Sequence, residues 1–245
     1  MSRRSPFALA TLALALAACD GYGNDPVSPP PPLPPQQVLS GAGDITQVVA
    51  DYRALIGAVR RISWDGVPDA LNNADNALPA KFFTVSQGAV FATAGTGFRN
   101  DSTLFKDVNP KYEDQFAFFS PTKTFAAVGS NVIDVTFRVR ADTLITGVVT
   151  GFGAVFSDVD VANTTRLEYF DRNNVLIGRH QVPVRTDAAG LSFMGVKFES
   201  ALVARVRITL GTGALGAGID DVTDGGQADL VILDDFNYGE PEAQP

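Results

Sequence analysis

The amino-acid sequence predicts an all-β protein: a two-sheet antiparallel sandwich, jelly-roll-like, with one N-terminal amphipathic helix. Three observations predict this fold class. Short runs rich in β-branched and aromatic residues recur about every ten residues. Segments rich in Gly and Asp separate these runs, and only one early stretch shows helical periodicity. No repeat of fixed length indicates a propeller or a solenoid.

Composition limits the partners and the chemistry of this chain. Its 245 residues are 45% apolar, which is enough for a sizeable core, and its net charge is −8. Such an acidic chain lacks the basic footprint that nucleic acid phosphates require, so we expect no nucleic acid partner. Cys19 and His180 are its single cysteine and single histidine, which excludes an intrachain disulfide and a zinc site of the Cys/His kind.

Residues 1–18 are predicted to be a lipoprotein signal peptide. Two arginines precede an apolar run that is too short to span a bilayer. The run ends in Leu16-Ala17-Ala18-Cys19, which resembles the lipobox of bacterial lipoproteins. The resemblance implies cleavage before Cys19 and attachment of lipid to it, hence an exported protein anchored in the cell envelope. The sequence leaves open whether the inner or the outer membrane holds it.

A proline-rich linker is predicted to follow the lipidated cysteine, over residues 19–40. Six of the seven residues from Pro29 to Pro35 are proline, which favours an extended polyproline helix. Such a segment serves as a semi-rigid spacer between the lipid and a folded domain. We expect the sandwich over residues 41–241 and a polar tail over 242–245.

The first element of the domain is predicted to be an amphipathic helix over residues 44–59. Asp44 followed by Gln47 is a helix-start signal. The apolar residues that follow at helical spacing are Ile45, Val48, Val49, Tyr52, Leu55, Ile56 and Val59. The helix either packs on the edge of a sheet or binds a partner. Trp64 comes next, and we expect it to fill the core rather than to stack on a sugar.

The strands are predicted from short β-prone runs bounded by turn residues. In the run 131–140, Ile133, Val135 and Phe137 alternate with polar residues, as in a strand with one wet face. Residues 171–174 form a hairpin signal. The predicted strands cover 81–85, 89–94, 115–119, 131–140, 143–150, 151–160, 166–170, 174–178, 191–198, 203–210 and 228–236.

The run Gly151–Asp160 has an apolar face that continues into two carboxylates. Side chains of a strand alternate between its faces, so Asp158 and Asp160 are predicted on the side of three apolar residues. Those three residues are Phe152, Ala154 and Phe156. With residues 229–236, this run is the best candidate for a central pair of core strands.

Four aspartates are candidate ligands for a structural Ca²⁺: Asp158, Asp160, Asp234 and Asp235. Calcium takes six to eight oxygen ligands, which these carboxylates supply if their two strands are neighbours. An aspartate on an apolar face, as predicted for Asp234, must be hydrogen-bonded, paired or bound to a metal. The alternative is that the aspartates cap turns, with Asp234 satisfied by the backbone or by an arginine such as Arg205.

We expect no enzymatic activity and no catalytic residues. The chain has no histidine network, no Gly-x-Ser-x-Gly elbow and no phosphate-binding loop. A glycosidase needs two carboxyl groups facing each other across a cleft, and nothing in the sequence specifies such a pair. A carbohydrate-active hydrolase is therefore the least favoured alternative.

Four segments resemble a group of exported bacterial proteins of unassigned function. They are Ser63–Pro68, Gly129–Asn131, Thr150–Asp160 and Leu233–Pro241. That group is similar to the sandwich domains of surface proteins with a PEP-CTERM sorting tail, although this chain lacks the C-terminal apolar helix and basic tail of those proteins. The resemblance implies an envelope location and a lectin-like sandwich, and it supplies no catalytic residues.

These observations predict an envelope-anchored lipoprotein whose sandwich is a non-enzymatic module that binds glycan or matrix. Its membrane partner is the lipid bilayer, through Cys19. The alternative is a structural or assembly component of the envelope. Such a component would contact other envelope proteins through a sheet edge or through the 44–59 helix.

Overall fold

The computed structural model describes residues 32–187 and 189–244. Cys19, the predicted signal peptide and most of the predicted linker lie outside the described residues. Within them, none of the helices is both long and apolar enough to cross a membrane.

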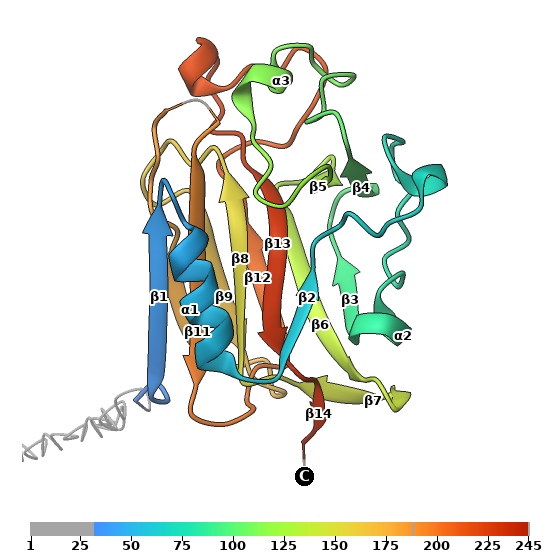
Figure 1. The fold of residues 1–245 in the computed structure, drawn as a ribbon, viewed down its shortest axis with the longest axis vertical. Helices are drawn as coiled ribbons and strands as arrows, with labels where there is room; N and C mark the ends of the chain where they lie inside the picture. Colours follow the sequence, from blue (N-terminus) through green and yellow to red (C-terminus); the bar gives the residue numbers. More distant parts are fainter. Residues whose placement is uncertain (1–31, 188, 245) are drawn as a thin grey trace, which may run out of the picture. The chain divides into compact units, whose positions relative to one another are not determined.

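Two antiparallel sheets make up the sandwich (Figure 1). In the described residues, sheet A has the order β1-β11-β8-β13-β5-β4, with β2 beside β13, and sheet B has the order β10-β9-β12-β6-β7-β14, with β3 beside β6. The strands of sheet A are β1 (Gln36–Ala42), β2 (Val59–Ile62), β4 (Gly97–Asp101), β5 (Thr124–Val128), β8 (Gly151–Ser157), β11 (Leu191–Phe198) and β13 (Ile232–Gly239). Those of sheet B are β3 (Ala89–Ala92), β6 (Val132–Val139), β7 (Asp142–Val148), β9 (Arg166–Phe170), β10 (Leu176–Gln181), β12 (Arg205–Thr209) and β14 (Glu242–Ala243).

The strand order confirms the predicted jelly roll. Eight strands form two four-stranded blocks, β5-β13-β8-β11 in sheet A and β6-β12-β9-β10 in sheet B. The chain crosses between the blocks from β5 to β6, from β8 to β9 and then at each step from β10 to β13. Two Greek keys wound in this way define a jelly roll.

The strands β8 and β13 are neighbours at the centre of sheet A, as predicted. Phe156 lies opposite Leu233, and Ala154 lies opposite Phe236. All residues of both strands are buried, because sheet B covers one face and α1 (Thr46–Ile56) packs on the other. Phe152 faces the main core, whereas Val155 faces the helix.

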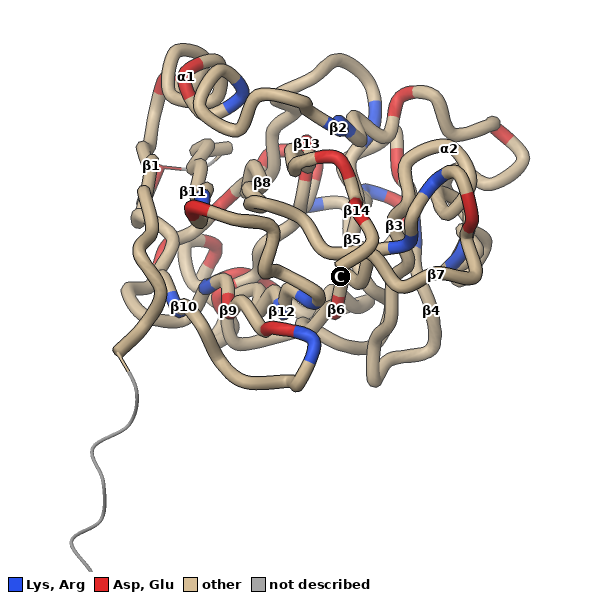
Figure 2. Tube along the Cα trace, turned by 90° about the horizontal axis from the view of Figure 1, so that it is seen from below, with Lys and Arg blue, Asp and Glu red and all other residues tan. Residues whose placement is uncertain are grey.

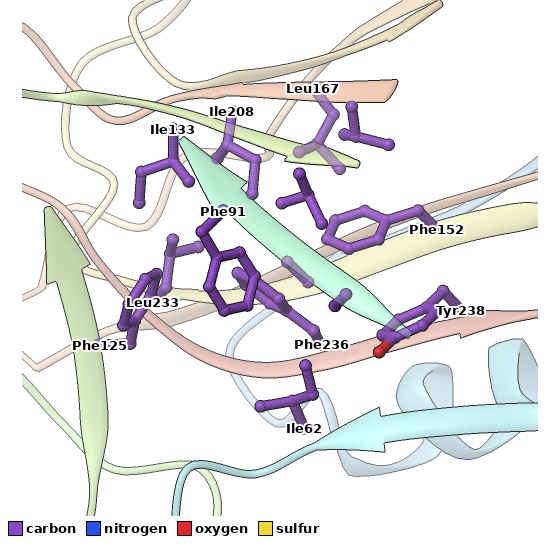
Figure 3. Close-up of a cluster of buried hydrophobic side chains, with 14 of the residues drawn as sticks. Ile62, Phe91, Phe125, Ile133, Phe152, Leu167, Ile208, Leu233, Phe236 and Tyr238 are labelled. Atoms are coloured by element: carbon purple, nitrogen blue, oxygen red, sulfur yellow. The ribbon is translucent and has the colours of Figure 1, made fainter. Parts of the chain in front are cut away.

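The main core between the sheets is aromatic, and Trp64 lies within it. Its indole ring stacks on Phe125 with 4.0 Å between centroids and meets Phe236 edge-on at 5.0 Å. The indole N–H donates a 2.7 Å hydrogen bond to the carbonyl of Asp234. Figure 3 shows Phe91, Phe125 and Phe236 converging in the same region of the core. Trp64 is thus a core residue, as predicted.

The helix α1 is shorter than the predicted 44–59 span. It begins at Thr46, whose amide donates to the Asp44 side chain at 3.1 Å, and it ends at Ile56 before Gly57, which has a φ of +77°. The helix anchors on Tyr52, whose ring lies over two glycines of sheet A. A Cβ on Gly195 would come within 2.7 Å of that ring, and one on Gly153 within 2.9 Å.

Two predicted strands were wrong. Residues 81–85 form a turn that leads into α2 (Thr84–Gln87), and Gln115 is the last residue of α3 (Tyr112–Gln115). Short apolar runs do not by themselves distinguish a strand from a turn whose side chains are buried. Phe82 and Phe83 pack against the main core from such a turn.

The sandwich also contains strands that the sequence did not predict. The strand β1 lies largely within the predicted linker, and it pairs with β11 from Gln36 to Ala42. It is a partly exposed edge strand with mixed polar residues, so it lacks an apolar alternation. β2, β4 and β5 were also missed, and Glu242–Ala243 of the predicted tail pairs with β7 as β14. Short 3₁₀ turns cover Asp69–Leu71 (η1) and Val222–Asp224 (η2).

Substitution of Trp64 by alanine should lower the free energy of unfolding by about 3–5 kcal/mol, because it leaves a large cavity and an unpaired carbonyl. Urea unfolding of the full-length chain measures this loss. The control is Leu144→Ala, at a side chain that is 88% exposed, which should change the stability by less than about 0.5 kcal/mol. A similar small effect of Trp64→Ala would contradict the placement of this residue.

Candidate metal centre

Four aspartates meet where β8 ends and β13 begins. Asp158 and Asp160 directly follow β8, Asp229 precedes β13, and Asp221 lies immediately before η2. Since β8 and β13 are antiparallel neighbours, with Ser157 opposite Ile232, the end of one strand lies beside the start of the other. All four aspartates are buried, and Asp160 is the most exposed of them at 9%. We call this set the aspartate cluster.

Three members of the aspartate cluster are close enough to share one cation. Asp158, Asp160 and Asp221 each offer a carboxylate oxygen, and these oxygens lie within 4.8 Å of one another. Calcium–oxygen distances are about 2.3–2.6 Å, so ligands on opposite sides of an ion are separated by about 5 Å. The three oxygens therefore fit within one coordination sphere.

Several oxygens of the aspartate cluster are buried without a hydrogen-bond donor. Within the described residues, neither oxygen of Asp160 has a partner, and Oδ1 of Asp158 has none. A buried polar atom without a partner is costly, and a buried carboxylate is more so. These oxygens are what a cation would bind.

The other oxygens of the cluster are held by amides and hydroxyls. Asp221 accepts hydrogen bonds of 2.8 Å from the amides of Thr223 and Leu230. Asp229 accepts one of 3.1 Å from the amide of Asp160 and another from the hydroxyl of Thr164. These neutral donors orient the carboxylates but supply no full positive charge, so the cluster has no counter-ion among its hydrogen-bond partners in residues 32–187 and 189–244.

The side-chain amide of Gln115 links α3 to the cluster. It donates to Oδ2 of Asp158 and, at 2.8 Å, to the hydroxyl of Thr223. The hydroxyl of Thr223 in turn donates to Asp221 at 2.8 Å. This chain of hydrogen bonds connects α3, the turn after β8 and the segment of η2.

The electrostatics of the cluster oppose ionisation. Burial raises the pKa of Asp158 to about 8, and the charges of Asp160, Asp221 and Asp229 add to this effect. Burial and the neighbouring Asp221 raise the pKa of Asp160 to about 7. Burial likewise raises the pKa of Asp229. A divalent cation at this point would reverse these effects, because it attracts each carboxylate and screens their mutual repulsion.

The sequence predicted that strand alternation places Asp158 and Asp160 on one face, and this prediction was wrong. The strand ends at Ser157, and Asp158 has a φ of +73°, in the left-handed region. The amide of Asp158 donates to the carbonyl of Gly190 at 2.8 Å, which fixes this turn. Asp158 and Asp160 thus come together through a turn rather than through register.

Asp234 and Asp235 lie outside the group of three carboxylates, although they were predicted to share a site with Asp158 and Asp160. Between Leu233 and Phe236 the register of β13 shifts, so both aspartates stand opposite the single residue Val155. Such a bulge redirects side chains. This geometry separates the four predicted ligands into different environments.

The carboxylates of Asp234 and Asp235 are bonded to protein groups, although Oδ1 of Asp235 has no hydrogen-bond partner within the described residues. Asp234 accepts hydrogen bonds from the Phe119 amide at 2.7 Å and the Ser120 hydroxyl at 2.9 Å. Asp235 pairs through Oδ2 with Arg53 of α1 at 2.6 Å and with Arg61 of β2 at 2.8 Å. These contacts join the bulge to a loop and to α1. The candidate metal site is therefore the aspartate cluster and does not include Asp234 or Asp235. Arg205, the suggested partner of Asp234, pairs with a different carboxylate, Asp134.

Sequence reasoning counted Asp221 and Asp229 in a wider acidic group with Asp220 and Asp224 but did not choose them as ligands, and it did not select Gln115 or Thr223. Asp221 and Asp229 stand in or beside a loop rich in Gly and Asp, in which Asp220 and Asp224 both pair with Lys111 instead. Gln115 was assigned to a strand. No local signal distinguishes these residues, because only the fold determines which loop acids face β8.

Comparisons with known proteins give little further information. No protein-family model matches the sequence, and no curated protein matches it. Among solved structures, the chain is similar to the K2 cleaved adhesin domain of Lys-gingipain, with a TM-score of 0.40 and 6% identity over 74% of this chain and 97% of that chain. It is also similar to the enzymatically active domain of bacteriophage CBA120 tailspike protein 4, with a TM-score of 0.25 and 11% identity over 71% of this chain and 20% of that chain. At these scores, neither similarity transfers a function.

The raised pKa values predict how the calcium-free protein responds to pH. A carboxyl group whose folded-state pKa is raised stabilises the fold below its unfolded-state pKa, and this contribution is lost as pH rises through the folded value. For Asp158 and Asp160, the free energy of unfolding should therefore fall between about pH 4 and pH 8.

Urea unfolding across this pH range, with the Asp158→Asn/Asp160→Asn variant as the reference, isolates the contribution of the two carboxyls. The variant should show a weaker decline in stability with pH. Identical pH profiles for the two proteins would contradict the electrostatics described for the cluster.

Proposed function

We propose that this protein is a non-enzymatic binding module of the bacterial cell envelope, with a structural Ca²⁺ in the aspartate cluster and a glycan or matrix ligand. The observation that carries the calcium proposal is the set of buried, unpartnered oxygens of Asp158 and Asp160 beside Asp221. The jelly-roll sandwich, a fold also used by lectin domains, is consistent with a binding role.

The donor set favours calcium over other common metals. All the available ligands are carboxylate oxygens, whereas zinc prefers nitrogen and sulfur ligands. Magnesium demands near-ideal octahedral geometry and retains several waters, which suits an enclosed all-protein site poorly. Calcium accepts the irregular geometry that a turn and two loops provide. The ion would hold together the segment after β8 and the segment before β13.

Burial of the cluster argues against catalysis by these carboxyls. In glycoside hydrolysis, two carboxyl groups contact a sugar from opposite sides of an accessible cleft. Asp158 has no exposed surface, and Asp221 is only 1% exposed. A polysaccharide cannot reach groups enclosed in this way, so the raised pKa values fit a metal site without its ion better than a pair of catalytic acids.

The calcium proposal predicts a shift in thermal stability. Addition of Ca²⁺ at about 100 times its dissociation constant should raise the Tm of the EDTA-treated full-length chain by about 5–10 °C, because the ion binds only the folded state. Asp160→Asn should abolish this response and should itself raise the Tm in EDTA, since it removes one of the mutually repelling charges.

A matched control is Asp51→Asn, at an exposed aspartate of α1 that accepts a hydrogen bond from Gln47 of the same helix. This variant should retain the full response to Ca²⁺. An unchanged Tm of the wild-type protein in Ca²⁺ would remove the metal from the proposal and leave the aspartates as turn formers.

The envelope location makes a separate prediction at Cys19. In a bacterial host, Cys19→Ser should block incorporation of labelled palmitate and move the protein from the membrane fraction to the soluble fraction. The expected cause is loss of the acyl chains, two or more of which anchor a protein stably. Retention of the variant in the membrane fraction would show that another feature holds the protein there.

A further inference from the structure

We propose that the outer face of sheet B binds an acidic polysaccharide, through arginines that recognise its uronic acid carboxylates. This inference rests on the proposed function and gives its ligand a chemical class. We call the surface the arginine face, after the outward-pointing arginines of β6, β9, β10 and β12. They are Arg138, Arg166, Arg179, Arg205 and Arg207.

The register of sheet B brings these arginines together. Arg207 of β12 lies opposite Asp134 of β6 on one side and opposite Glu168 of β9 on the other. Arg179 of β10 also lies opposite Glu168. Adjacent strands are about 4.8 Å apart, so side chains in one such row form a continuous polar strip across the sheet.

The arginines outnumber the carboxylates that they contact. Asp134 is shared by Arg205 at 2.8 Å and Arg207 at 2.8 Å. Glu168 is shared by Arg166 at 3.3 Å and Arg179 at 2.7 Å. Two carboxylates therefore neutralise only half of the charge of these four guanidinium groups. The fifth arginine, Arg138, donates to the hydroxyl of Thr146, which is a neutral partner.

Arg179 and Arg207 are more exposed than the carboxylates that they contact, whereas Arg205 is about as buried as Asp134. The side chains of Arg179 and Arg207 are 57% and 42% exposed, whereas those of Glu168 and Asp134 are 8% and 21% exposed. Burial alone would raise the pKa of Asp134, but hydrogen bonds from Arg207 and Arg205 outweigh it and lower the pKa below its usual value. Asp134 thus remains ionised and holds Arg205 and Arg207 in place.

The chemistry of the face fits carboxylates. A guanidinium group has five N–H donors in a planar fork, which bind a carboxylate in a bidentate way. Arg179 and Arg207 each use Nε and one terminal nitrogen on the acid that they contact, and the five N–H donors of a guanidinium group exceed these contacts. Thr136 lies on the same face, and although its hydroxyl donates to the carbonyl of Val90 at 3.4 Å, its oxygen can accept a hydrogen bond from a sugar.

On the arginine face, Arg179 is exposed and the other four arginines are half-buried. Figure 2 shows α1 and β2 on one side of the sandwich and β9, β12 and β6 on the opposite side. Because the chain as a whole carries a charge of −8, a positive face of this kind is local. A flexible anionic strand can lie on the face and avoid the acidic remainder, whereas an extended DNA duplex would meet the remainder as well.

The test measures binding of the full-length chain to hyaluronate, a soluble uronic acid polymer, with dextran as a neutral polymer. The test variant is Arg179→Gln/Arg207→Gln, which leaves Arg166 on Glu168 and Arg205 on Asp134 and so keeps each acid paired. We expect binding to hyaluronate but not to dextran. We expect the double variant to bind at least about tenfold more weakly, with a weaker dependence on salt.

The matched control is Arg61→Gln/Lys81→Gln, which removes two positive charges that do not belong to the arginine face and leaves Arg53 on Asp235. It should bind hyaluronate within about twofold of the wild type. The single variant Arg179→Gln, at the most exposed of the paired arginines, repeats the test with a smaller disturbance of the fold.

Three outcomes would overturn the proposal: equal binding of hyaluronate and dextran, equal losses in the test and control variants, or tighter binding to DNA or to anionic phospholipid vesicles than to hyaluronate. The calcium-dependent Tm separates this result from the proposed function. A Tm shift without hyaluronate binding would remove only the ligand class, and hyaluronate binding without a Tm shift would remove only the metal.

Discussion

The structure depends on the pairing of β8 with β13, which is buried on both faces. Sheet B covers one side of the pair, and α1 covers the other, where Tyr52 lies on Gly153 of β8 and Gly195 of β11. No residue of either strand reaches solvent to any large extent. Polar side chains at the ends of these strands therefore enter an environment in which each charge must be compensated by protein groups or by a bound ion.

The acids along this pair are compensated in two different ways. At the bulge in β13, Asp235 is compensated by two arginines and Asp234 by the amides and hydroxyl of the 119–120 segment. At the end of β8, the donors are neutral, and oxygens of Asp158 and Asp160 have no partner within the described residues. Arg53 and Arg61 supply positive charge to Asp235, whereas the hydrogen-bond donors of the cluster in the described residues are neutral, so a cation at the end of β8 would supply the missing charge.

Sequence patterns predicted the features that depend on local periodicity. The jelly roll, the burial of Trp64 and the adjacency of β8 and β13 followed from alternation, spacing and apolar content. The edge strand β1 was missed because its pairing uses backbone hydrogen bonds, which any sequence without proline can make. The partners of the aspartates were missed for a different reason: Asp221 and Gln115 reach Asp158 through tertiary contacts, over separations of 63 and 43 residues.

Calcium binding itself is the most direct measure of whether the buried acids form a metal centre. Equilibrium dialysis of the full-length chain against radioactive calcium should show one saturable site per chain. Asp158→Asn should abolish that site, and Asp235→Asn should leave it intact, since Asp235 belongs to the arginine pair at the bulge. Absence of saturable binding, or a site that survives Asp158→Asn but not Asp235→Asn, would contradict the assignment of the ion to the end of β8.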